Sequence, residues 1–220
     1  MATSDSVWAR TETSDPIVSD RVYNATIGGV LLWGFFVNYM TVTNVPVETI
    51  LAIPWWMLLV GYFLSVLVGT MMYQSSDKPA ISFLGYNFIV VPVGIVLTPF
   101  LYGIDPNIIG KAMILTGGFT GIMMTLGIMY PSFFLSLGRV LFFSLLLMIG
   151  VQFAMAFFFH LESSVIDWII ALIFCGYIGY DWARANKIPK TLDNAVDSAA
   201  SLYLDIINLF IRIIRILGRR

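Results

Sequence analysis

Long apolar runs separated by short polar breaks dominate the pattern of this 220-residue chain. A helix needs roughly 20 residues to cross a hydrocarbon core about 30 Å thick. Because the breaks between the runs are only a few residues long, we predict an up-and-down helical bundle with no soluble domain inserted. The six runs of suitable length are 24–43, 49–73, 80–102, 108–130, 133–159 and 165–181.

A seventh run, 198–217, is amphipathic rather than uniformly apolar. At about 100° per residue, its polar side chains fall on one face around Asp205. A polar stripe in a bilayer must face protein partners, a water-filled path or the membrane surface. The members of this stripe are Ser198, Ser201, Asn208, Arg212 and Arg215. We therefore predict an all-α, polytopic transmembrane bundle of seven helices over residues 24–220, preceded by a polar N-terminal tail, residues 1–23.

Composition narrows the function classes. Hydrophobic residues make up 59% of the chain and charged residues 11%, which excludes a water-soluble globular domain. The net charge of −1 and the lack of a basic stripe outside the last third of the chain exclude nucleic acid as a partner. With one Cys and one His, the chain cannot build a disulfide framework, a His-rich zinc site or a bis-imidazole haem site. We expect no cofactor.

The positions of Lys and Arg predict the topology. With the N-terminus in the cytoplasm, the inside segments hold most of the basic residues, and the outside breaks hold none apart from Lys111 just within the fourth run. This distribution agrees with the positive-inside rule. The basic residues of the inside segments are Arg10, Arg21, Lys78, Arg139, Arg184, Lys187 and Lys190. We expect an integral membrane protein with a cytoplasmic N-terminus.

Two aspartates lie at or within apolar runs and are the candidates for function. Asp181 ends the sixth run and Asp205 lies inside the seventh, where a carboxylate costs several kcal/mol unless it is paired, protonated or hydrated. The polar linker 182–197 is long enough to bring both to one depth. Within hydrogen-bonding distance they would share one proton and form a pH-responsive latch or a cation site. Alternatively, Asp181 lies at the water interface and Arg212 or Asn208 neutralises Asp205.

The residues around both aspartates resemble a known family. Ile178-Gly-Tyr-Asp181, then Ser201-Leu-Tyr-Leu-Asp205-Ile-Ile-Asn-Leu-Phe210 and a basic amphipathic end, closely resemble the C-terminal signature of the Bax inhibitor family; Leu137-Gly138-Arg139 adds a fainter likeness. The resemblance implies six helices around a central C-terminal helix and a pH-sensitive passive calcium leak, with calcium as the transported ion. It also implies the bacterial plasma membrane as the location.

The same resemblance assigns roles to residues. It implies that Asp181 and Asp205 act as pH sensor and gate and as low-affinity calcium ligands. Leak-type relatives carry an arginine cluster between the second and third helices, where this chain has Gln74-Ser-Ser-Asp77-Lys78. Lys78 would substitute in part, although an ammonium does not reproduce a bidentate guanidinium. The residues expected to line or support the path are Ser201, Asn208, Arg212 and Arg215.

Two other functions remain open. Members of the bacterial branch have been linked to a membrane-bound ATP-dependent protease as modulators, and eukaryotic relatives to suppression of cell death, so this chain could act on a membrane partner without transport of its own. An intramembrane aspartyl protease also uses two aspartates. Here, however, Leu202-Tyr-Leu precedes Asp205 in place of Gly-x-Gly, and no Pro-Ala-Leu follows. We therefore expect no enzymatic activity.

Overall fold

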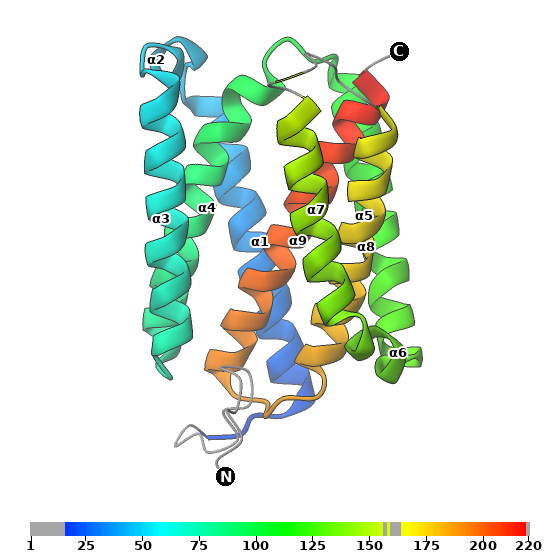
Figure 1. Cartoon of the computed structure of the whole chain (residues 1–220). Coiled ribbons are helices and arrows are strands. Elements are labelled where there is room, and N and C mark those ends of the chain that lie inside the picture. The colour runs from blue at the N-terminus through cyan, green and yellow to red at the C-terminus, as the bar shows by residue number, and fades with distance from the viewer. Residues whose placement is uncertain (1–15, 156–157, 159–163, 219–220) are drawn as a thin grey trace. The chain divides into compact units, whose positions relative to one another are not determined.

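The structure is a computed structural model that describes residues 16–155, 158 and 164–218. Within these residues every regular element is a helix, and the chain forms two compact units (Figure 1). The first unit contains residues 1–103 and 187–201, and the second contains residues 104–186 and 202–220. The long helix α9 (Leu192–Gly218) contributes its beginning to the first unit and its remainder to the second.

The first unit is built on three long helices. These are α1 (Asp20–Asn44), α3 (Trp55–Ser75) and α4 (Pro79–Leu101), with the short α2 (Val47–Leu51) between the first two. Helix α4 packs against both α1 and α3. Two glycines allow the close approach of α3 and α4, since a Cβ on Gly69 would lie 2.5 Å from the carbonyl oxygen of Gly85.

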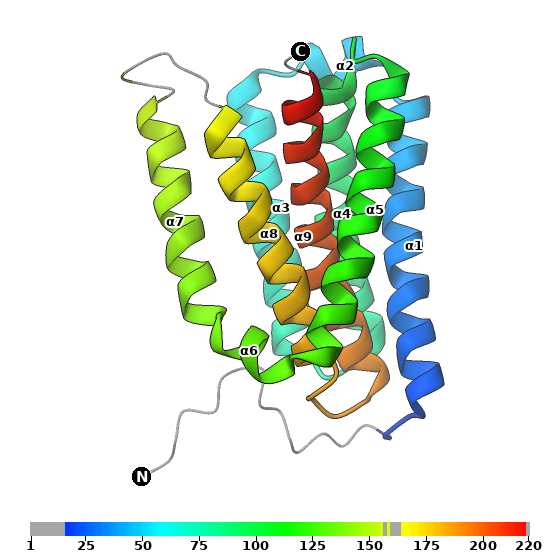
Figure 2. The same ribbon diagram turned by 90° about the vertical axis from the view of Figure 1, so that its right-hand side faces the viewer.

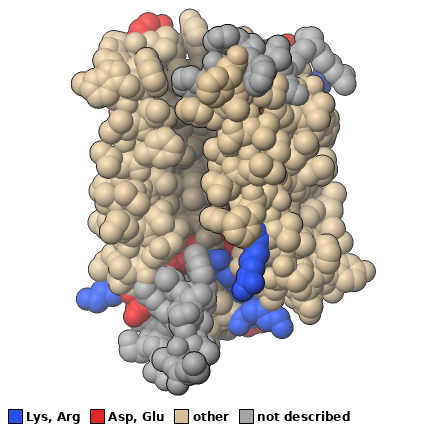
Figure 3. Space-filling view, in the orientation of Figure 1, with Lys and Arg blue, Asp and Glu red and all other residues tan. Residues whose placement is uncertain are grey.

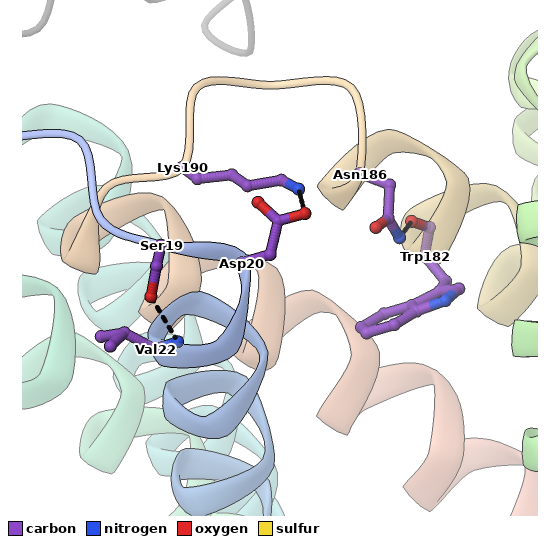
Figure 4. A network of polar contacts seen from close by, with 6 residues as sticks. All are labelled: Ser19, Asp20, Val22, Trp182, Asn186 and Lys190. Atoms are coloured by element: carbon purple, nitrogen blue, oxygen red, sulfur yellow. Dashed lines mark hydrogen bonds and ion pairs between the residues drawn. The ribbon is translucent and has the colours of Figure 1, made fainter.

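The beginning of α9 completes the first unit through buried polar contacts. Ser82 Oγ donates a hydrogen bond to Asp193 Oδ1 over 2.7 Å, and the hydroxyls of Tyr23 and Ser198 lie 3.2 Å apart. At the surface, Lys190 Nζ lies 2.8 Å from Asp20 Oδ2, as Figure 4 shows. The first unit therefore depends on residues from near both ends of the chain.

The second unit contains α5 (Pro106–Met129), α6 (Pro131–Ser136), α7 (Gly138–Ala154) and α8 (Ser164–Ala185). Helix α8 packs against the other three (Figure 2). Glycine permits a close contact between α5 and α8, because a Cβ on Gly127 of α5 would lie 2.7 Å from the carbonyl oxygen of Gly179 on α8. Asn186, just beyond α8, donates its side-chain amide to the carbonyl of Trp182 over 2.8 Å (Figure 4).

Local signals explain several helix ends. Proline occupies the first position of α4, α5 and α6, where its missing N–H costs no intrahelical bond. Asp105 caps α5 by accepting a hydrogen bond from the backbone N–H of Asn107 over 2.8 Å. Gly103, in the break before α5, has a φ of 78°, which favours glycine.

The prediction of a polytopic helical membrane protein is confirmed. Five helices of the described chain are long and apolar enough to cross a membrane: α1, α3, α4, α5 and α8. Helix α7 is apolar over 17 residues, and α9 is long but amphipathic, so the count of seven spans remains a prediction. On the face shown in Figure 3, uncharged residues cover the sides of the helices, and the visible charges lie toward the helix ends.

Several predicted boundaries were wrong. The second run begins later than residue 49, because Pro54 separates α2 from α3. The fifth run divides at Leu137 into α6 and α7. Helix α8 continues beyond Asp181 to Ala185 and α9 already begins at Leu192, so the predicted linker 182–197 is mostly helical. Most of the predicted N-terminal tail, residues 1–15, lies outside the described residues.

Candidate functional site

The candidate site lies within the second unit, where α8 carries Asp181 and α9 carries Asp205. Both residues are buried, with exposed fractions of 9% and 7%. Their carboxyl groups are close enough to act on each other. The structure therefore brings together the two aspartates that the sequence singled out.

A hydrogen bond between two carboxyl groups needs a proton on one of them. Oδ2 of Asp205 is buried and receives no hydrogen bond from any N–H or hydroxyl of the described chain. A proton shared with Asp181 would satisfy that oxygen. With this proton the pair carries one negative charge, and without it two.

Arg184 balances the remaining charge. Its Nη1 lies 3.4 Å from Oδ1 of Asp181, one helical turn away on α8, and its guanidinium also acts on Asp205. The side chains of Arg184 and Asp181 are only 12% and 11% exposed. One guanidinium and two carboxyl groups sharing a proton make a neutral buried set, which lowers the cost of placing it among apolar helices.

Sequence reasoning missed this role of Arg184 and used the residue only to predict topology. The signal was present in the Asp-x-x-Arg spacing from Asp181, because residues three apart on a helix are neighbours. Tyr177, one turn before Asp181, also lies within electrostatic range of both carboxyl groups. Its phenol places one more polar group near the pair.

The neutralisation of Asp205 within its own helix is not observed. Asn208 Nδ2 donates to the backbone carbonyl of Leu204 over 2.7 Å. Arg212 Nη1 donates to Asp167 Oδ1 over 2.8 Å instead. The Asp181 side chain is buried within the protein, and the alternative that this residue lies at the water interface stays a prediction.

Arg212 belongs to a second polar cluster in the same unit. Besides Asp167 on α8, it reaches Gln152 on α7, with Nη2 at 3.1 Å from Oε1. Asp167 is 1% exposed, so this is a buried ion pair that ties three helices together. Sequence reasoning did not single out Asp167, which follows Val165-Ile166 at the start of an apolar run.

The other predicted site residues lie in different environments. Ser201 belongs to the first unit and is half-buried, while Lys78 is exposed at the N-terminal cap of α4 in that unit. Arg215 lies half-buried in the last turns of α9. On α9, Asn208, Arg212 and Arg215 are all partly buried.

The donor set for a metal is small. Among the described residues no three His, Cys, Asp or Glu side chains gather as metal ligands would. Asp181 and Asp205 are therefore a two-carboxylate set, whereas a firmly bound Ca²⁺ takes six to eight oxygens. Such a pair suits transient contact with a cation rather than tight binding.

Comparison with known proteins gives the family. The sequence model described as "Inhibitor of apoptosis-promoting Bax1" matches residues 17–220. The chain is 32% identical over 170 residues to Bax inhibitor 1 of Schizosaccharomyces pombe, covering 74% of this chain and 62% of that protein. It is 28% identical over 125 residues to the inner membrane protein YbhL of Escherichia coli, covering 51% and 52%.

A BI1-like protein of Arabidopsis thaliana is 43% identical over 84 residues, covering 37% of this chain and 32% of the relative. The chain thus spans between a third and two thirds of the length of these relatives. The family match includes both aspartates and every described helix. This chain belongs to the Bax inhibitor family of membrane proteins.

Proposed function

We propose that this protein is a pH-sensitive passive calcium leak gated by Asp181 and Asp205. The observation that carries the proposal is the pair of buried carboxyl groups that act on each other from two helices of a membrane protein. Ionisable groups at such positions are costly and mark ion or proton pathways. The proposal covers transport only and includes no chemical reaction and no cofactor.

The charge of the pair supplies the mechanism. The shared proton holds α8 and α9 together at this level and leaves a single charge, which Arg184 balances. Loss of the proton leaves two carboxylates that repel each other and attract a hard cation such as Ca²⁺. The exchange of one proton therefore changes both the helix contact and the affinity for the ion.

The path would follow the polar face of α9. Asn208 and Arg215 are half-buried there, on the side of the helix that carries Asp205. Ser201 continues this face into the first unit. Lys78, the counterpart of the arginine cluster of leak-type relatives, would act as a weaker basic group.

The test is calcium flux into dye-loaded proteoliposomes from about pH 8 to pH 6, because a pair that shares a proton makes the flux depend on pH. We expect wild-type flux to vary with pH and Asp181→Asn and Asp205→Asn to abolish or shift that dependence. Asp20→Asn is the matched control, because it removes an exposed carboxylate. Equal flux at every pH in all four proteins would contradict the proposal.

A second candidate function is action on another membrane protein, such as a quality-control protease. The description of the family as an inhibitor of a protein supports it. In this case the aspartate variants stay functional, and removal of residues 1–20 releases the partner in a pull-down. Cleavage of a model transmembrane substrate would instead favour the intramembrane protease.

A further inference from the structure

The second unit contains an open cavity that the carboxyl pair does not occupy. Its volume is about 510 Å³, within the range of about 300–1,000 Å³ typical of small-molecule sites. It lies where α6 ends and α7 begins, against α8. Its lining residues are Leu135, Ser136, Gly138, Arg139, Phe142, Phe143 and Tyr180.

Two polar groups in this lining are available to a ligand. The guanidinium of Arg139 forms no ion pair or hydrogen bond within the described residues, and the hydroxyl of Tyr180 forms no hydrogen bond there. Ser136 donates its hydroxyl to the carbonyl of Phe133 over 2.7 Å, which leaves its lone pairs free. A guanidinium and a phenol are both donors, so together they favour an anion with several acceptor oxygens.

The packing of Gly138 positions the phenol. A Cβ at Gly138 would lie 2.9 Å from the Tyr180 ring and 3.1 Å from its hydroxyl oxygen, so only glycine admits the ring here. The guanidinium of Arg184 lies 5.9 Å from the centre of the same ring. Arg184 is paired with Asp181, so Arg139 is the basic side chain that this lining offers to a ligand.

The apolar part of the lining indicates what kind of anion fits. Phe142 and Phe143 follow Arg139 on α7 and are 58% and 65% exposed. Helix α7 is mainly apolar after Arg139, which places a basic residue at the beginning of an apolar helix, as at the level of lipid headgroups. A lipid fits this order of polar and apolar surface, with its phosphate at Arg139 and an acyl chain along the two phenylalanines.

We propose that this cavity binds the headgroup phosphate of an anionic phospholipid, with Arg139 and Tyr180 as the donors. The first acyl carbons lie along Phe142 and Phe143. Arg139 recognises the phosphate through paired N–H donors, and the phenylalanines distinguish a lipid from a free phosphate. The site is independent of calcium transport.

The experiment is native mass spectrometry of the delipidated full chain in a neutral detergent. The probes are dihexanoyl-phosphatidylglycerol, dihexanoyl-phosphatidylcholine and glycerol 3-phosphate. We expect one phosphatidylglycerol bound at least about tenfold more tightly than either of the others. Equal binding of the two lipids would overturn the anionic preference, and glycerol 3-phosphate binding as tightly as the lipid would show a free-phosphate site instead.

Variants locate the site. Arg139→Gln and Tyr180→Phe should each weaken phosphatidylglycerol by about tenfold, whereas Arg21→Gln, which removes an exposed arginine from α1, should not. Phe142→Ala should weaken the lipid without changing glycerol 3-phosphate. If Arg139→Gln fails to fold, the affinity of Tyr180→Phe for phosphatidylglycerol is the test of the site. Unchanged affinity in Tyr180→Phe and in any folded Arg139→Gln overturns the proposal.

Discussion

Asp167 and Arg212 show how the cost of a buried charge depends on its partner. Their atoms Oδ1 and Nη1 lie 2.8 Å apart, and the Asp167 side chain is only 2% exposed. Removal of one partner leaves the other charge buried and uncompensated, which costs about 3–5 kcal/mol, whereas removal of both costs much less. The ion pair therefore matters for stability chiefly because loss of one member leaves the other charge buried without a partner.

We predict that Asp167→Asn and Arg212→Gln each lower the free energy of unfolding by about 3 kcal/mol, and that the double variant loses less than their sum. Denaturant unfolding in detergent measures this. Asp20→Asn, which breaks an exposed ion pair with Lys190, should cost less than about 1 kcal/mol. Strict additivity of the two single effects would show that the residues are not coupled.

Arg184 supports a prediction about transport. Arg184→Gln leaves the carboxyl pair without its cation, so calcium flux in proteoliposomes should respond to pH differently from the wild type. Arg184→Lys keeps the charge but not the planar guanidinium and should fall between the two. Arg21→Gln is the control for loss of a positive charge. If the pH dependence of calcium flux in Arg184→Gln is the same as in the wild type, Arg184 has no role in gating.

At the scale of the element, close contact between α5 and α8 holds the second unit together. Gly127 of α5 lies against the backbone of Gly179, which cannot move aside as a side chain can. Gly118 lies on the same helix, but a Cβ added there would meet no heavy atom of the described residues within 4 Å. The two glycines therefore provide a matched comparison.

We predict that Gly127→Ala destabilises the protein by about 1–3 kcal/mol, because the added methyl group forces the helices apart. Gly118→Ala should instead leave stability unchanged or raise it by up to about 1 kcal/mol through helix propensity. Thermal unfolding in detergent compares them. Equal effects of both substitutions would contradict the role of this helix contact.

Hydropathy alone predicted that the apolar runs are helices, but not where they end. Helix α8 continues beyond Asp181 because Asp181 and Arg184 pair with each other on the same face, so two charged residues that look like a boundary remain helical. Pro54 separates α2 from α3, so the long helix of the second run begins later than predicted. Hydropathy averaged over a stretch of sequence does not show such ion pairs and helix breaks, because they depend on individual residues and their contacts.

The candidate site, like the helices, was predictable only in part. The depth of Asp181 and Asp205 in apolar sequence, together with the family resemblance, identified the pair. The partner of Arg212 was not predictable, because Asp167 is distant in sequence and only the packing of α8 against α9 brings them together. The contact between Asp167 and Arg212 cannot be read from a single sequence.

At the scale of the whole molecule, the first unit is discontinuous in sequence. Residues 187–201 complete it, and the buried contact of Ser82 with Asp193 is one of the links. The break around Gly103 lies between the segments of the two units, and Tyr102 beside it is 67% exposed. This break is a suitable place to divide the chain.

We predict that residues 1–103 and 104–220, expressed together as separate chains, associate and co-purify, because the second fragment supplies the beginning of α9. Asp193→Ala in that fragment should lower the yield of the complex severalfold, since it leaves the buried Ser82 hydroxyl without its acceptor. Glu48→Ala, an exposed change in the first fragment, is the control. Equal yields with both substitutions would contradict a role for this contact.

The shared helix also has a consequence for biosynthesis. The ribosome makes α9 after all the other described helices, yet Tyr23 and Ser82, which enter the membrane far earlier, find their partners on it. Until then these hydroxyls lack their partners on α9, and Asp181 in the second unit lacks Asp205. Neither unit is therefore complete before α9 has been made.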